Sequence, residues 1–280
     1  MKNYPLNEVE YYSTFRAMIE ALPEGREDLP GISWFTRKGE QQGVTLGKLR
    51  EDVRDLQAAF VDAGLAGKHI AILGENSYEW LLVYFAATYC GATAVCVDVE
   101  QPDETIHQMI DMSDSDALVF IPSLCEICMP YGAKGKQLYL LSGNGDAPNL
   151  SELIEKGSAL RKEKGSQLDT YVDGDMTASI VFTSGTTSYS KPVMLSQSAI
   201  LTNASDALAN VAIGDVAFTS LPFYHTYGFT CSVLSMLIGK AHLYINGNLK
   251  TVMRDIQLAR PHTMLTVPQS SRVLHRSSQA

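Results

Sequence analysis

One segment of the 280-residue chain places small hydroxyl side chains and a glycine directly after an apolar stretch, with Lys191 four residues beyond them. Backbone N–H groups around a glycine can form an anion-binding nest, hydroxyls add donors, and a lysine brings a point charge to phosphate oxygens. This combination predicts a phosphate-binding loop, although an ordinary Ser/Thr turn has a similar composition. The small residues are Thr183, Ser184, Gly185, Thr186 and Thr187.

The same loop offers a partner for a metal ion that accompanies phosphate. Mg²⁺ prefers phosphate oxygens, water and few protein ligands, so a hydroxyl such as that of Thr186 could help to hold it. The pattern differs from a Walker A loop, because GxxxxGK(S/T) requires a glycine before its lysine and Ser190 precedes Lys191. The segment therefore predicts phosphate binding of another type.

A second segment, Leu221 to Gly228, places a histidine among aromatic side chains. His225 could act at a binding site, or it could begin a helix and bond only to backbone. The aromatic residues, taken alone, are more typical of a core than of a substrate pocket. These neighbours are Phe223, Tyr224, Tyr227 and Phe229.

Apolar spacing predicts helices that alternate with strands. Apolar residues at 3,4,3,4 spacing from Leu46 to Phe60 predict a helix capped by Thr45, and Asn76 or Ser77 is expected to cap a second helix. The alternation indicates an α/β fold with parallel sheets and right-handed crossovers. Strands are expected at 69–73, 92–97, 117–121, 137–141, 178–182, 193–195, 216–221 and near 243 and 264, and further helices at 103–112, near 124, from 151, from 198 and at 229–238.

Composition argues against several classes of function. With 22 Lys+Arg against 31 Asp+Glu, the formal net charge is −9, whereas a nucleic-acid partner requires a basic stripe. A local pocket of N–H groups can still bind a small anion in an acidic protein. We identify no signal peptide at the N-terminus, and a helix followed by a buried strand explains the apolar run from Trp80 to Val97 better than a membrane span does.

The five cysteines are expected to be reduced thiols in a cytoplasmic protein, because their number is odd and Cys90, Cys96 and Cys231 lie in apolar runs. Cys125 and Cys128 form a single CxxC, with no second pair and no histidine at ligand spacing. This arrangement favours two sulfurs on one buried helix face over a metal or redox site.

Taken whole, FTSGTTSYSKPVMLSQ (182–197) resembles the phosphate-loop signature of the adenylate-forming (AMP-binding) superfamily, roughly (Y/F)TSGTTGxPKGVxLSH. The segment from Leu221 to Gly228 is similar to the family's LPxxHxxG segment, and its histidine favours the acyl- and aryl-CoA synthetase branch. With weaker matches in the same order, the resemblance covers about residues 40 to 268.

The sequence departs from the family signature at four positions. Ser188 and Pro192 stand where the family has glycines, Ser190 where it has proline, and Gln197 where it has a closing histidine. Serine reaches positive φ less easily than glycine, and proline removes a backbone N–H. These changes could loosen the cradle or alter its flexibility.

The resemblance implies an AMP-forming acid–thiol ligase. In this family ATP activates a carboxylic acid as an acyl-adenylate with release of pyrophosphate, and a thiol, usually that of CoA, then displaces AMP. It implies that the loop from Thr183 to Lys191, Ser188 included, binds ATP phosphates with Mg²⁺, and that Lys191 and His225 act in catalysis. The implied substrate pocket contains Phe223, Tyr224, His225, Tyr227 and Gly228.

The resemblance also implies two α/β subdomains side by side. Residues 66–197 would form the first, with the phosphate loop, and residues 1–65 and 198–280 part of the second. Family members are about twice as long and carry YGxTE and TGD segments and a small C-terminal domain, none of which we find. We therefore expect an N-terminal portion with an incomplete second sheet, whose apolar edge near 240–280 would favour self-association.

Two other classes of function stay open at this point. The chain could be a degenerate module that binds nucleotide or acyl chains without turnover, or a fragment without independent function. The sequence does not single out the carboxylic acid, and the acceptor could be CoA or a carrier-protein thiol.

Overall fold

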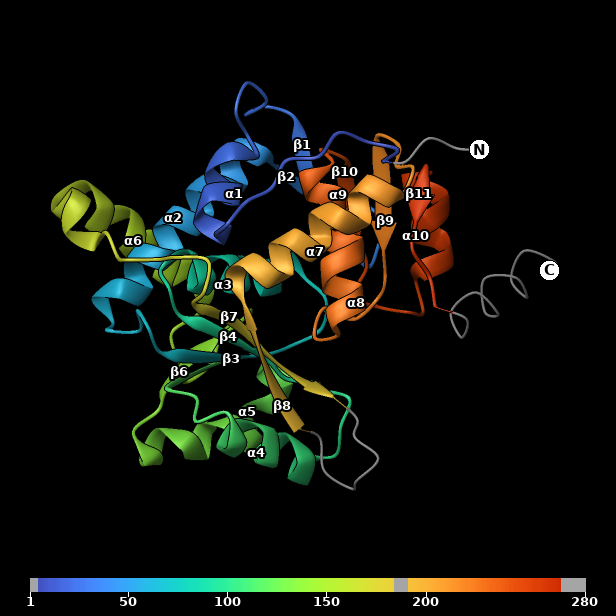
Figure 1. Ribbon diagram of the computed structural model, residues 1–280. Coiled ribbons are helices and arrows are strands. Elements are labelled where there is room, and N and C mark those ends of the chain that lie inside the picture. Colours follow the sequence, from blue (N-terminus) through green and yellow to red (C-terminus); the bar gives the residue numbers. More distant parts are fainter. Residues whose placement is uncertain (1–4, 184–190, 268–280) are drawn as a thin grey trace.

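Two β-sheets, each built from strands that alternate with helices, organise the computed structural model, which describes residues 5–183 and 191–267 (Figure 1). The α/β class predicted from the sequence is confirmed. The pattern of two sheets side by side with covering helices is confirmed as well.

The six-stranded sheet is covered on both faces. Ile70 and Ile72 belong to one apolar cluster, whereas Ala71 and Leu73 belong to another on the opposite face. Burial on both faces explains why these strands are continuous apolar runs in the sequence. Its strands are β3 (His69–Leu73), β4 (Thr93–Cys96), β5 (Ala117–Phe120), β6 (Gln137–Leu140), β7 (Thr177–Thr183) and β8 (Lys191–Ser196), in the order β6-β5-β3-β4-β7-β8.

The five-stranded sheet combines an N-terminal hairpin with strands from the last part of the described chain. At its edge lies a strand of two residues that pairs, among the described residues, with a single neighbour. The strands are β1 (Pro30–Phe35), β2 (Gln41–Thr45), β9 (Val216–Thr219), β10 (His242–Ile245) and β11 (Thr263–Met264), in the order β11-β9-β10-β1-β2.

The expectation of parallel sheets is wrong for two strand pairs. β1 pairs antiparallel with β2, and β7 pairs antiparallel with β8. Both connections are short, spanning residues 36–40 and 184–190, whereas a parallel crossover needs a dozen or more residues. The other strand pairs are parallel, as predicted.

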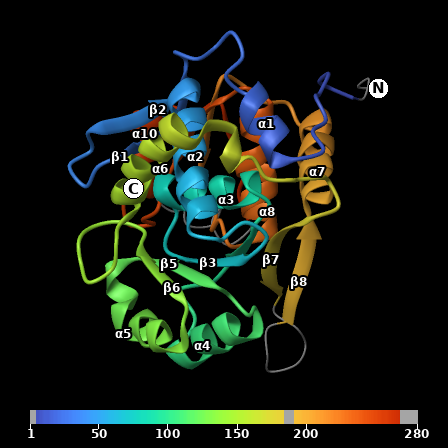
Figure 2. The same cartoon turned by 90° about the vertical axis from the view of Figure 1, so that its left-hand side faces the viewer.

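One helix, α3 (Tyr78–Tyr89), is buried along almost its whole length and joins the apolar layers of the two sheets. Figure 2 shows α4 and α5 on the opposite side of the six-stranded sheet. The other helices are α1 (Phe15–Ala21), α2 (Leu46–Asp62), α4 (Asp103–Met112), α5 (Cys125–Cys128), α6 (Leu150–Lys164), α7 (Gln197–Asn210), α8 (Thr226–Phe229), α9 (Ser235–Ile238) and α10 (Val252–Ala259), with 3-10 turns η1 (Pro122–Leu124), η2 (Met129–Lys134) and η3 (Gly165–Leu168) and a π-helical turn η4 (Thr230–Leu234).

Side-chain caps fix where the main helices begin. The Thr45 hydroxyl accepts a hydrogen bond from Lys48 N at 3.1 Å, as the sequence predicted. Of the two candidates for α3, Ser77 is the cap, and Asn76 is left to make other contacts. Across the described part of the chain, we find no helix with the length and apolar character that crossing a bilayer requires.

Candidate functional site

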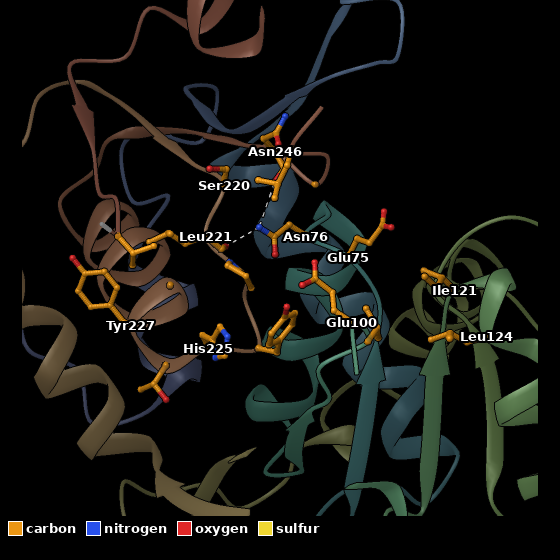
Figure 3. A pocket seen from close by; sticks show the side chains of 18 of the residues that line it. Glu75, Asn76, Glu100, Ile121, Leu124, Ser220, Leu221, His225, Tyr227 and Asn246 are labelled. Carbon is orange, nitrogen blue, oxygen red and sulfur yellow. Dashed lines mark hydrogen bonds between the residues drawn. The ribbon is translucent and has the colours of Figure 1, made fainter. Parts of the chain in front are cut away.

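A cavity of about 710 Å³ opens between the two sheets, at the carboxyl ends of their parallel strands (Figure 3). Glu75 and Asn76 follow β3, Glu100 follows β4, Ser220 follows β9, and Asn246 follows β10. In open α/β sheets this edge is where ligands bind, because loops from several strands converge there. The cavity is therefore the candidate functional site.

The segment from Leu221 to Gly228 forms one wall of the cavity. The His225 amide donates to the Pro222 carbonyl at 3.2 Å, which closes a tight turn immediately before α8. A Cβ atom at Gly228 would lie 2.4 Å from that same carbonyl, so only glycine lets α8 pack against the turn. Tyr224, His225, Tyr227 and Gly228 thus all line the cavity.

Phe223, which we expected in the substrate pocket, does not line this cavity. Its side chain is buried against the Trp80 ring, with ring centroids 5.5 Å apart. Phe229 is buried in the same way, 4.3 Å from the Tyr84 ring. Successive residues of a tight turn point to different sides, so the same segment supplies both core and cavity wall.

The helix that follows the turn contains a π-helical stretch, η4, between α8 and α9. The Ser232 hydroxyl donates to the Gly228 carbonyl and lies 2.8 Å from the Thr219 hydroxyl. These buried contacts anchor the helix to β9. Single π-helical turns inside α-helices occur frequently at functional sites.

Asn76 connects the two sides of the cavity. Its Nδ2 donates to the Leu221 carbonyl at 2.8 Å and to the Asn246 carbonyl at 3.3 Å, and its Oδ1 accepts from Phe223 N at 2.9 Å. Figure 3 shows the side chain reaching from the β3 side towards the opposite wall. One carboxamide, placed after β3 of the six-stranded sheet, thus contacts the segments that follow β9 and β10 of the five-stranded sheet.

The described lining includes two carboxylates, those of Glu75 and Glu100. Tyr224 lies near this acidic side. Burial first, and then the carboxylates of Asp98 and Glu100, raise the pKa of the Tyr224 hydroxyl above its ordinary value. The hydroxyl therefore stays protonated at neutral pH and can donate a hydrogen bond to an anionic group in the cavity.

Thr183 and Lys191 lie opposite each other at the ends of β7 and β8. Both side chains are exposed, and neither lines the cavity. A hydroxyl and an ammonium on paired strand ends suit phosphate oxygens in their donor chemistry. The predicted loop residues Ser184, Gly185, Thr186, Thr187 and Ser188, including the Mg²⁺ candidate Thr186, lie outside the described residues.

Two departures from the family signature have clear structural positions. Pro192 lies in β8, the edge strand of its sheet, where proline is tolerated. Gln197 is fully buried, and its side chain accepts from Phe15 N at 2.9 Å and donates to the Thr88 carbonyl at 3.0 Å. Gln197 therefore ties α1 and α3 to the start of α7.

The two cysteines of the CxxC pair lie on α5, with Cys128 buried and Cys125 partly buried. Within residues 5–183 and 191–267, no three or more His, Cys, Asp or Glu side chains are grouped so that they could hold a metal ion.

Sequence reasoning missed Glu75, Asn76, Glu100, Ser220 and Asn246 as lining residues. Of these five, Asn76 was considered from the sequence as a possible helix cap. A usable signal was present, since each of the five lies in the last residues of a predicted strand or a few residues beyond it. Polar residues at the carboxyl ends of parallel strands are therefore the pattern that could have identified them.

The fold identifies the structural class of the protein. The fold is that of the N-terminal domains of adenylate-forming enzymes: over 98% of this chain it matches a long-chain-fatty-acid-CoA ligase from Archaeoglobus fulgidus, with a TM-score of 0.79 and 21% identity, covering 55% of that chain. The anthranilate CoA ligase AuaEII matches over 91% of this chain and 49% of its own, with a TM-score of 0.78 and 14% identity. These likenesses concern the fold.

The family follows from the sequence as a whole. Residues 21–280 match the family model described as AMP-binding enzyme, and the chain belongs to this family. It is 24% identical over 275 residues to the long-chain-fatty-acid–CoA ligase heimdall of Drosophila melanogaster, covering 88% of this chain and 40% of the relative. It is 29% identical over 204 residues to a D-alanine–D-alanyl carrier protein ligase of Streptococcus pyogenes, covering 72% of this chain and 34% of the relative. The chain thus spans less than half the length of these relatives.

Proposed function

We propose that this chain carries the N-terminal part of an AMP-forming acid–thiol ligase that activates a carboxylic acid with ATP and transfers the acyl group to CoA. The observation that supports this most directly is the cavity at the strand ends, which gathers Tyr224, His225, Tyr227 and Gly228 from one motif. Membership of the AMP-binding family supports the same reaction class. The carboxylic acid is left open, and a carrier-protein thiol is the alternative acceptor.

In this proposal the end of the β7–β8 hairpin binds the ATP phosphates, and the cavity binds the carboxylic acid. Lys191 and Thr183, with residues 184–188 between them, hold the β- and γ-phosphates of ATP together with Mg²⁺, for which Thr186 is the candidate hydroxyl. His225 lies beside the carboxylate or acyl group, and Tyr224 and Tyr227 contact the substrate. Catalysis in such a site consists mainly of positioning and charge stabilisation.

The subdomain division proposed from the sequence has support in the sheet topology. The strands from β3 to β8, within residues 66–197, all belong to the six-stranded sheet. The strands before residue 66 and after residue 197 belong to the five-stranded sheet. We take these as two subdomains with the candidate site at their junction, in a cytoplasmic protein that contains five free cysteines.

A second candidate function is binding without turnover. It is favoured by Pro192, which lacks a backbone N–H at the start of β8. Incubation with a panel of carboxylic acids, Mg-ATP and CoA, followed by detection of AMP, separates the two functions. Release of AMP supports the ligase, and nucleotide binding without AMP release supports the binding module.

The first experiment is calorimetric binding of Mg-ATP to the wild type, Lys191→Ala and Lys162→Ala. Loss of a charge-assisted contact at Lys191 should weaken binding by about 1.5–3 kcal/mol, or roughly 10- to 150-fold. Lys162 is exposed on α6 and serves as the matched control. Binding that is equally strong in all three proteins would contradict the phosphate role of Lys191. No binding by any of them would leave a fragment without independent function.

A further inference from the structure

Asn76 follows β3, and its carboxamide hydrogen-bonds to the segments that follow β9 and β10. No other side chain in the described cavity lining connects these three segments. We propose that Asn76 is a positioning residue, which fixes the turn carrying His225 relative to the opposite wall of the cavity. The consequence for ligand binding rests on the proposed function. The argument for the positioning itself uses contacts within the chain.

The three hydrogen bonds of Asn76 require a carboxamide. The two carbonyl oxygens it contacts can only accept, and the amide of Phe223 can only donate. Asparagine supplies donors and an acceptor on one planar group, whereas aspartate would place an oxygen against both carbonyls. Each contact is therefore chemically matched, and an apolar replacement would leave the three backbone groups without their partner.

The bonds to Leu221 and Phe223 lie on either side of Pro222, whose carbonyl accepts the His225 amide. Asn76 thus holds the base of the turn, and Gly228 lets α8 pack against it from the other side. The turn is held from two directions. A shift at its base would move His225 directly.

The approach of Asn76 to β10 depends on a glycine. A Cβ atom at Gly247 would lie 2.2 Å from the Asn76 backbone oxygen, which is closer than any real contact. The same two residues, with Glu75 and Asn246, also line a smaller cavity of about 230 Å³ beside the aromatic pair Trp34 and Tyr78. Asn76 and Gly247, with Glu75 and Asn246, form a junction that separates the two cavities.

The test compares Asn76→Ala and Gly247→Ala with the wild type and with Asn203→Ala, which removes an exposed carboxamide from α7. Three properties are measured: urea unfolding, amide hydrogen exchange of residues 221–228, and binding of a hydrolysis-resistant acyl-adenylate analogue. We expect the Phe223 amide to exchange roughly tenfold faster or more in Asn76→Ala after correction for global stability. We expect the analogue to bind roughly tenfold more weakly.

Gly247→Ala perturbs the junction by steric contact but keeps every hydrogen-bonding group of Asn76. It therefore provides a second test if Asn76→Ala does not fold. It should also speed exchange in residues 221–228 and weaken the analogue, whereas Asn203→Ala should change neither. Unchanged exchange in both junction variants overturns the proposal. So does faster exchange with unchanged analogue binding, because the contact would then be merely structural.

If the wild type does not bind the analogue, the proposed function fails separately from this inference. In that case the NMR resonances of the His225 imidazole test the positioning role of Asn76. Resonances that move in Asn76→Ala and stay in place in Asn203→Ala support the positioning role, and resonances unmoved in both variants overturn it.

Discussion

The two segments that carry the sequence motifs differ in how they are supported. The turn from Leu221 to Gly228 is held by side-chain hydrogen bonds, a buried phenylalanine and a glycine contact. The described ends of the β7–β8 hairpin, Thr183 and Lys191, are exposed, and β8 is an edge strand. One motif is therefore built into the core, while the described ends of the other are exposed, next to a sheet edge.

This difference shows that a motif alone does not say how its residues are held. In the turn, substitutions should change stability and ligand binding together, because the wall of the cavity is also core. At the hairpin end, substitutions should change binding alone. The predictions below measure how far this separation extends.

The largest effect is expected for Phe223→Ala. Its side chain is 1% exposed and packs against Trp80, so its truncation should lower the free energy of unfolding by about 3–5 kcal/mol. Met194→Ala, at an exposed position of β8, should change it by less than about 0.5 kcal/mol. Urea denaturation measures both. Equal losses in the two variants would contradict the contrast between turn and hairpin.

A smaller loss is expected at the base of the hairpin, where Gln197 begins α7. Gln197→Ala leaves Phe15 N and the Thr88 carbonyl without their buried partner, so the free energy of unfolding should fall by about 1–3 kcal/mol. Gln167→Ala, on an exposed 3-10 turn, is the control. A loss confined to Gln197→Ala would show that the hairpin is anchored at its base.

The pH dependence of stability should report the burial of Tyr224. Its pKa is raised in the folded protein, whereas the unfolded chain titrates near pH 10. Its contribution is therefore complete below about pH 10 and is lost as the pH rises further. Between pH 8 and pH 10.5 the wild type should lose roughly 0.5–1 kcal/mol more than Tyr224→Phe does.

Urea denaturation at the two pH values provides the measurement. Tyr227→Phe, which removes a hydroxyl from a side chain 48% exposed, is the matched control. A pH dependence of Tyr224→Phe identical to that of the wild type would show that the Tyr224 hydroxyl ionises as easily in the folded protein as in the unfolded chain.

The smallest effect is expected for self-association, predicted from the apolar edge near residues 240–280. Leu258, 48% exposed on α10, is one apolar side chain of this region. Sedimentation velocity should show association that rises with concentration and weakens less than tenfold in Leu258→Lys, about the contribution of one exposed leucine. A monodisperse monomer at all concentrations would remove this prediction.

Most of the architecture could be predicted from the sequence, because local signals and packing agree. The helix from Leu46 has an apolar stripe and a Thr45 cap, and α4 has the predicted bounds. The short elements α1, β1, β2 and α10 were not predicted. α1 has seven residues, and its buried face depends on contacts with distant parts of the chain.

The sequence predicted those site residues that belong to a recognisable motif. It did not predict those whose role depends on contacts between segments far apart in the chain. His225 was identified by its motif, and the cavity contains it. Asn76 was interpreted as a helix cap, because nothing local distinguishes a capping asparagine from one that bonds to residues 145 and 170 positions away. The core position of Phe223 likewise depends on Trp80, far from it in sequence.

The orientation of the cavity wall depends on the number of residues in the π-helical turn η4 (Thr230–Leu234). An α-helix turns through about 100° per residue, and a π-helical turn accommodates one more residue than a regular turn does. Deleting one residue between Thr230 and Leu234 would restore regular winding and swing Tyr227 and His225 around the helix axis, while α9 stays packed. The direction in which this wall faces is thus set by chain length in the next turn, and not only by the side chains on the wall itself.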